Sequence, residues 1–190
     1  MESKSNVRKI VVAGALGALS IALFLTPFGY IPWFVGVSLT VMHVPAIIGA
    51  VLEGPVVGMI VGGIFGVTAL VKAATAPLGI FDPYFVNPLI SVLPRILIGL
   101  VAWAVYKAFR GKLVPLAAAT AGVAGSLTNS ILVLGALVAF SPFPLATAVA
   151  VFVANSLLEA AVGGVLTLGV VAAWKGIESR SGKAKLAKEE

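Results

Sequence analysis

The sequence contains no cysteine, one histidine and few charged residues. Without cysteine it can form neither a disulfide nor a thiolate metal site, and it has no cysteine nucleophile. A single histidine does not supply a credible zinc site. The phosphate-binding pattern Gly-x-x-x-x-Gly-Lys-Ser/Thr is also absent, because leucine follows Gly111 and Lys112. The sequence therefore indicates neither an enzyme nor a protein that holds a metal or a cofactor.

Long apolar runs dominate what is present. Hydrophobic residues make up 60% of the 190 residues and charged residues 11%, which is far from the composition of a soluble domain. Runs of about 20 apolar residues can cross the ~30 Å hydrocarbon core as helices. The net charge of +6 could suggest nucleic acid, but the basic residues lie mainly beside the ends of apolar runs, where they orient a protein in a bilayer. We therefore predict an all-α membrane protein whose partner is the lipid bilayer, with no nucleic acid.

Proline, glycine and charge clusters divide the chain into six apolar segments. These are 8–27, 34–52, 55–72, 88–109, 115–140 and 145–174. We expect one six-helix transmembrane domain over 1–174 and a solvated basic tail over 175–190. Glu-Gly-Pro at 53–55 predicts a tight turn between the second and third helices. The connection 73–87 has two prolines and several aromatic residues, and is expected to form an ordered external loop.

The basic residues predict the orientation in the membrane. Six spans place both termini on one side, and every lysine and arginine except Lys72 and Arg95 falls on that side. Positively charged residues favour the cytoplasmic side. The N-terminus and the C-terminus are therefore expected in the cytoplasm, and the protein is expected in the cell membrane.

Polar side chains interrupt four apolar segments at a similar depth. Counted at ~1.5 Å per residue from the outer end of each segment, they lie about 10 to 17 Å below the outer edge. They are His43, Arg95, Asn129 and Asn155. Glu159 lies one helical turn deeper than Asn155, on the same face. Because a charge at the bilayer centre costs about 2.5 to 3.5 kcal/mol, such groups usually face the bundle interior or a wet cavity.

Two interpretations of this polar layer remain open. In one, Arg95 and Glu159 form a buried ion pair and the asparagines link helices, so the layer is structural. In the other, which we favour, the layer lines a substrate pocket, and aromatic residues of the external loop close over it. These aromatic and apolar residues are Ile80, Phe81, Tyr84 and Phe85. His43 alone is more typical of a packing residue, and Trp33 of an interfacial anchor.

Small residues recur at four-residue spacing in two segments. They are Gly14, Ala18 and Ala22 in the first, and Gly54, Gly58, Gly62 and Gly66 in the third. Such stripes let helices approach closely in a membrane. We favour packing within the bundle for the third segment, and leave packing and a partner surface open for the first.

Two stretches carry a resemblance to a known family. They are HVPAIIGAVLEGPVVGMIVGGIFGVTALVKA and NPLISVLPRILIGLVAWAVYKAF, with His-x-Pro, Gly-Pro and Pro-Arg-Ile patterns. With six short helices, a small-residue face on the first and a long external loop, the chain resembles the S-components of energy-coupling factor (ECF) vitamin transporters of prokaryotes. It is most similar to the pantothenate-specific type.

The resemblance implies a high-affinity vitamin-binding subunit that drives no transport by itself. A membrane coupling protein and two cytoplasmic ATPases would supply the power. In that family an Ala-x-x-x-Ala face on the first helix docks on the coupling protein, which Ala18 and Ala22 match here and Gly14 extends. The docked subunit is thought to topple in the membrane and carry its pocket inward.

Pantothenate is an anion with hydroxyl and amide groups, so the resemblance implies a cation and hydrogen-bonding groups in the pocket. Arg95 is the candidate for the carboxylate, because its planar fork suits such groups. Asn129 and Asn155 would hold the amide and hydroxyls, and Glu159 would orient Arg95 or Asn155. If Glu159 instead fully occupies Arg95, a neutral vitamin is favoured. The expected substrate contacts are Arg95, Asn129, Asn155, His43, Tyr84 and Trp33.

Other functions fit some of these features. The protein could be an S-component for another vitamin such as riboflavin, or a stand-alone proton-coupled carrier that uses Glu159 and His43. The absence of a convincing internal repeat counts against the carrier. A third alternative is a membrane scaffold whose polar layer is only structural.

Overall fold

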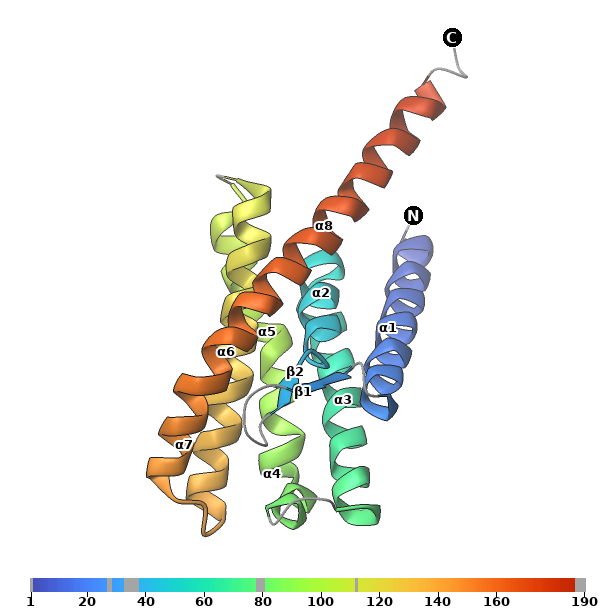
Figure 1. The fold of residues 1–190 in the computed structure, drawn as a ribbon. Coiled ribbons are helices and arrows are strands. Elements are labelled where there is room, and N and C mark those ends of the chain that lie inside the picture. Colours follow the sequence, from blue (N-terminus) through green and yellow to red (C-terminus); the bar gives the residue numbers. More distant parts are fainter. Residues whose placement is uncertain (1, 27–28, 33–37, 78–80, 112, 187–190) are drawn as a thin grey trace.

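Helices form almost all of the described chain, and a short hairpin lies among them (Figure 1). The computed structural model describes residues 2–26, 29–32, 38–77, 81–111 and 113–186. The elements are α1 (Glu2–Leu25), β1 (Tyr30–Pro32), β2 (Ser38–Thr40), α2 (Val44–Glu53), α3 (Pro55–Thr75), the 3-10 helix η2 (Asp82–Val86), α4 (Pro88–Ser91), α5 (Leu93–Phe109), α6 (Val114–Phe140), α7 (Leu145–Val151), the π-helical turn η3 (Phe152–Ser156) and α8 (Leu157–Leu186).

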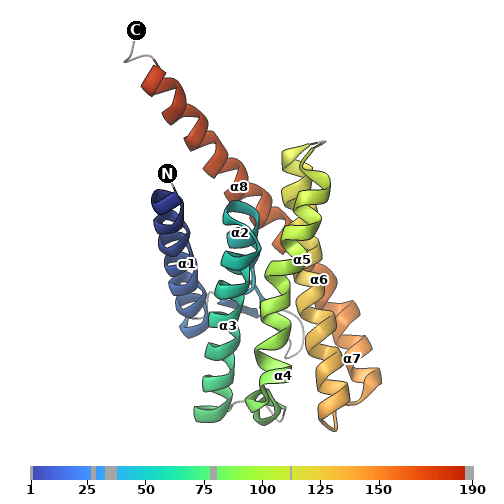
Figure 2. The same ribbon diagram turned by 180° about the vertical axis from the view of Figure 1, so that it is seen from behind.

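Five helical segments of the described chain are long and apolar enough to cross a membrane, and α2 is a shorter apolar helix. The five are Asn6–Leu25, Pro55–Thr75, Pro88–Phe109, Val114–Phe140 and Leu145–Gly176. The predicted all-α membrane bundle is therefore confirmed. The start of α1 and the end of α8 lie at one end of the bundle, which we call the terminal end (Figures 1 and 2). The opposite end, called the loop end, holds η2 and the turn between α6 and α7.

The second apolar segment differs from the helix predicted over 34–52. Ser38–Thr40 forms β2, which pairs antiparallel with β1 so that Thr40 faces Tyr30, and the helix begins only at Val44. Pro45 explains the late start, because its ring would collide with the carbonyl group of residue 41 in an earlier helix and it has no N–H to donate. The depth assigned to His43 by counting along a helix from residue 34 is therefore wrong.

Glycines bring α3 close to its neighbours. Gly54, with φ of 100°, forms the turn between α2 and α3 that the Glu-Gly-Pro pattern predicted. Along α3, a Cβ on Gly58 would lie 2.9 Å from Cα of Gly99, and one on Gly66 would lie 2.7 Å from the carbonyl oxygen of Ser91. The glycine stripe therefore lets α3 lie against α4 and α5, which agrees with the packing interpretation.

Both ends of the bundle are tied by side chains. At the terminal end, Arg8 Nε of α1 lies 2.7 Å from Glu53 Oε1 at the end of α2. The segment expected to be a solvated tail begins there as part of α8, which runs to Leu186. At the loop end, the rings of Phe81 and Phe143 meet edge to face with centroids 4.7 Å apart. This contact joins the residue before η2 to the turn between α6 and α7.

Candidate substrate-binding site

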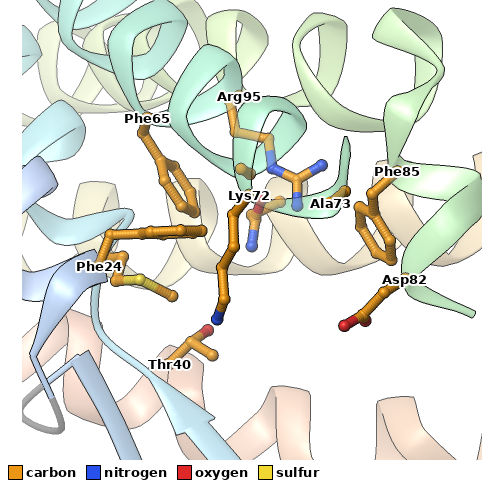
Figure 3. A pocket seen from close by; sticks show the side chains of 11 residues that line it. Phe24, Thr40, Phe65, Lys72, Ala73, Asp82, Phe85 and Arg95 are labelled. Carbon is orange, nitrogen blue, oxygen red and sulfur yellow. The ribbon is translucent and has the colours of Figure 1, made fainter. Parts of the chain in front are cut away.

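A cavity of about 230 Å³ lies where the hairpin meets the helices (Figure 3). Residues of α1, β2, α3, η2, α5 and α6 contribute to its wall. The lining residues are Phe24, Thr40, Met42, Phe65, Ala69, Lys72, Ala73, Asp82, Phe85, Arg95 and Asn129. The wall is thus mainly aromatic and aliphatic, with five polar or charged groups that can orient a ligand.

Arg95 is fixed in this wall by the break between α4 and α5. Pro94 has no N–H, so the carbonyl of Ile90 four residues earlier receives no helical hydrogen bond from it. Arg95 Nη1 donates to that carbonyl instead. The guanidinium carbon also lies 5.5 Å from the ring centroids of both Phe65 and Phe85, within the range of cation–π attraction. A buried arginine is therefore held in one orientation beside the cavity.

The backbone at Arg95 in turn depends on α3. A Cβ on Gly62 would overlap the carbonyl oxygen of Arg95, whereas a Cβ on the next residue, Gly63, would meet only Ile96 Cγ1 at 3.7 Å. Gly62 is therefore required for the close approach of α3 to the segment that carries the arginine.

Asn129 reaches the same cavity from α6, as predicted. Its side chain is only 8% exposed, and among the described residues its Oδ1 has no hydrogen-bond partner. A buried amide oxygen without a partner is unfavourable unless a ligand or water supplies a donor. Asn129 is therefore suited to accept a hydrogen bond from a bound molecule.

Sequence reasoning missed two charged residues of the lining, Lys72 and Asp82. Lys72 comes from the last turn of α3, with Nζ 5.1 Å from the ring centroid of Phe24, and it extends towards Thr40 (Figure 3). Asp82 begins η2 and faces the same open space from the opposite side (Figure 3). The sequence contained one signal for the lysine. Lys72 and Arg95 are the two basic residues that do not fall on the side of the termini.

Glu159 does not form the ion pair with Arg95 that one interpretation predicted. Its Oε1 accepts hydrogen bonds from the N–H of Thr40 at 2.5 Å, from the Thr40 hydroxyl at 2.7 Å and from Asn155 Nδ2 at 3.2 Å. The expected contact between Glu159 and Asn155 is thus present. Glu159 lies behind Thr40, outside the cavity lining.

His43 is a packing residue in this structure. It is buried at the start of α2, and its Nε2 lies 2.7 Å from Ser126 Oγ. The single hydroxyl proton of Ser126 is donated to the carbonyl of Gly122 at 2.9 Å, so the imidazole must be the donor in this contact. His43 does not line the cavity, so the geometry gives its predicted role as a substrate contact no support.

Two other predicted contacts also lie away from the cavity, and one is not described. Asn155 is buried beside Glu159 and does not line the cavity. Tyr84 packs against the cluster of Ile90, Val133 and Leu137, while Phe85 alone of the expected loop aromatics lines the cavity. Trp33 and Ile80 lie outside the residues that the structure describes. Of the six predicted contacts, the structure brings Arg95 and Asn129 together at the cavity.

Comparison with known proteins identifies the family. The sequence model described as "ECF transporter, substrate-specific component" matches residues 8–172. The chain belongs to this family. It is therefore the substrate-binding subunit, or S-component, of a vitamin transporter. Such a subunit is a multi-pass protein of the cell membrane and not an enzyme.

Two relatives of this S-component are named as pantothenate transporters. The pantothenic acid transporter PanT of Lactococcus lactis subsp. cremoris (strain MG1363) is 29% identical over 191 residues, which cover 90% of this chain and 95% of the relative. The pantothenate transporter PanT of Leuconostoc mesenteroides subsp. mesenteroides is 32% identical over 103 residues, which cover 52% of this chain and 50% of the relative.

Helix α1 presents two different faces in the S-component. Ala13, Gly17, Ser20 and Phe24 are buried, whereas Gly14, Ala18 and Ala22 are exposed. A Cβ on Gly14 would meet no atom within 4 Å. The small-residue stripe therefore does not pack within this bundle, and it forms a smooth face on the outside of α1.

Proposed function

We propose that this S-component binds pantothenate from outside the cell and delivers it for import. Arg95 carries the proposal, because a buried guanidinium held between two rings beside a cavity suits a ligand carboxylate. The names of the two PanT relatives support the same ligand. The hydrogen bonds of Glu159 to Thr40 and Asn155 also support it, since they remove the reason to favour a neutral vitamin.

The size of the cavity supports a small ligand. Pockets for drug-sized molecules have volumes of roughly 300 to 1,000 Å³, whereas this cavity has about 230 Å³. A short, flexible acid with an amide and hydroxyl groups suits this volume better than the three fused rings of a flavin. We therefore favour pantothenate over riboflavin.

Delivery in this proposal requires partners. The exposed stripe of Gly14, Ala18 and Ala22 docks on a membrane coupling protein, and two cytoplasmic ATPases drive the movement. The S-component topples in the membrane when docked, and carries its cavity from the outer to the inner side. A face of small residues suits this role because it allows close contact with a partner helix without large side chains that would have to interlock.

The test begins with native mass spectrometry of the gently purified protein, which should detect retained pantothenate. Titration of the ligand-free protein should then give saturable binding, with riboflavin as the competing candidate. Uptake into liposomes should require the coupling protein, the ATPases and ATP. Proton-driven uptake by the isolated protein would overturn the proposal in favour of a stand-alone carrier, and retention of a different vitamin would overturn the assigned ligand.

A further inference from the structure

Thr40 brings a hydroxyl group to the cavity wall, and the proton of this hydroxyl is already used. It is donated to Glu159 Oε1 at 2.7 Å. The same Oε1 also accepts from the backbone N–H of Thr40 at 2.5 Å and from Asn155 Nδ2 at 3.2 Å. A carboxyl oxygen that receives several donors has no proton of its own to give back. The Thr40 oxygen therefore offers only lone pairs to the cavity.

The surroundings of Thr40 keep it in this role. Its backbone pairs with Tyr30 in the hairpin, and its N–H and hydroxyl group share one carboxyl oxygen of Glu159. If the hydroxyl proton turned into the cavity, the Thr40 oxygen and Glu159 Oε1 would face each other with lone pairs alone, which is unfavourable. The structure thus fixes both the position of the Thr40 hydroxyl and the direction of its proton.

The Thr40 oxygen has room for a further donor. In Figure 3 it points into the open space, in the direction from which Lys72 extends. A hydroxyl oxygen has two lone pairs, so one remains for a ligand even when the ammonium group of Lys72 occupies the other. A ligand group that meets this lone pair has to donate a hydrogen bond.

Asn129 gives the wall a second acceptor by a different route. Its buried Oδ1 has no hydrogen-bond partner among the described residues. Thr40 lies on β2 and Asn129 on α6, so two separate elements bring acceptors to one cavity. A ligand with O–H or N–H groups can pair with them, whereas a ligand with acceptors alone leaves them unpaired. Sites that bind such donors discriminate strongly against analogues that lack them.

We propose, resting on the proposed function, that Thr40 is a specificity-determining residue of this S-component and that Glu159 is its positioning residue. Thr40 accepts a hydrogen bond from one donor of the ligand, an O–H or N–H group, and Glu159 keeps Thr40 an acceptor by holding its proton. The substrate class is a small acid that carries hydroxyl or amide donors apart from its carboxylate. Acids with only acceptor groups in their place are rejected, because acceptors would then face each other.

The experiment compares ligands that lack one donor each. The Kd is measured for pantothenate, for the two analogues in which fluorine replaces one or the other hydroxyl group, and for the analogue in which an ester oxygen replaces the amide N–H. Thr40→Val keeps the shape of the side chain and removes the acceptor. It should weaken binding of pantothenate about 2- to 12-fold, the range of a neutral hydrogen bond. Thr40→Ser, which keeps the hydroxyl group, should retain the original affinity.

The analogues identify the donor that Thr40 binds. Thr40→Val should leave binding unchanged or stronger for the one analogue that lacks this donor, and weaken the others as it weakens pantothenate. The analogue with undiminished affinity also shows that the variant is folded. Thr128→Val is the matched control, because Thr128 Oγ1 donates to the carbonyl of Ala124 at 2.7 Å and Thr128 does not line the cavity. Equal weakening of pantothenate and all analogues by Thr40→Val, or no weakening, would overturn the role of Thr40.

The role of Glu159 has its own measurement. Glu159→Ala releases the proton of Thr40, which can then be donated to fluorine or to the ester oxygen. The ratio between the Kd of the identified analogue and the Kd of pantothenate should therefore fall towards one, whereas Glu159→Gln keeps an accepting oxygen and should retain the ratio. A purely structural role would weaken both ligands equally, and an unchanged ratio in Glu159→Ala would exclude the positioning role. If the unaltered protein fails to bind pantothenate at all, the proposed function itself is wrong.

Discussion

Glu159 Oε1 accepts hydrogen bonds from both the backbone N–H and the hydroxyl of Thr40, 119 residues earlier in the chain. Thr40 ends β2, an edge strand at a depth where the surrounding helices are apolar. A strand edge at membrane depth requires partners within the protein, because lipid supplies none. The carboxylate satisfies this edge and joins the hairpin, which forms part of the cavity wall, to α8.

We expect Glu159→Ala to reduce both stability and ligand affinity. It leaves the partly buried N–H of Thr40 without its partner and removes hydrogen bonds to a charged group, each worth about 1.5 to 3 kcal/mol. Thermal unfolding in detergent and titration with ligand measure the two effects. Thr40→Val should remove part of the same interaction, so the double variant should lose less than the two single variants combined. Strictly additive losses would show that the two residues act independently.

Arg95→Lys should weaken the binding of pantothenate although it preserves the charge. The guanidinium of Arg95 donates to the carbonyl of Ile90 and lies between two aromatic rings. Lysine has no such planar fork. Disrupting a buried, hydrogen-bonded charge pair costs about 2 kcal/mol or more, which is about 30-fold in Kd. Calorimetric titration measures the change. Arg110→Lys, at the exposed end of α5, is the control, and equal affinity of both variants would remove Arg95 from the site.

Adjacent glycines on α3 should respond differently to the same substitution. Gly62→Ala places a methyl group against the carbonyl oxygen of Arg95, whereas Gly63→Ala adds one at ordinary contact distance from Ile96. We expect Gly62→Ala to lower the Tm and the ligand affinity, at a cost of about 1 to 3 kcal/mol for an overfilled contact. Gly63→Ala should leave both within error. If Gly62→Ala is also neutral, α3 does not approach α5 as closely as described.

Ala18→Trp should separate ligand binding from transport. Ala18 is exposed on α1, away from the cavity lining, so Kd should not change, whereas a bulky ring on the small-residue face should block contact with the coupling protein. Vitamin uptake by the reconstituted complex is expected to fall to background. Val165→Trp introduces the same ring at an exposed position of α8, where Val165 is 69% exposed, and should retain uptake. Normal uptake by Ala18→Trp would reject α1 as the docking face.

Regular helices explain which site residues could be predicted from the sequence. Arg95 and Asn129 lie on helices that follow the predicted segments, so counting residues along the chain placed them at the cavity. His43 could not be placed this way, because β2 and the late start of α2 replace the helix from which its depth was counted. Periodic apolar patterns identify helices but do not indicate a three-residue strand beside a proline.

The remaining site residues lie where periodicity carries no information. Lys72 stands in the last turn of α3, and Asp82 begins a 3-10 helix after a connection. At such positions the spacing of apolar residues does not determine whether a side chain turns inward or outward. Asn155 lies within a π-helical turn, whose wider spacing changes the direction of its side chains from that of an α-helix. The pairing of Asn155 with Glu159 could be predicted, but its position outside the cavity could not.

The short length of α2 determines how far a bound ligand still has to travel. This helix starts beside Met42 in the cavity wall and ends after ten residues at the terminal end, a rise of about 15 Å. The hydrocarbon core is about 30 Å thick. In the orientation that the basic residues predict, with the loop end outside, a molecule in the cavity has crossed about half of the permeability barrier before any energy is spent, and α2 with its neighbours seals the other half.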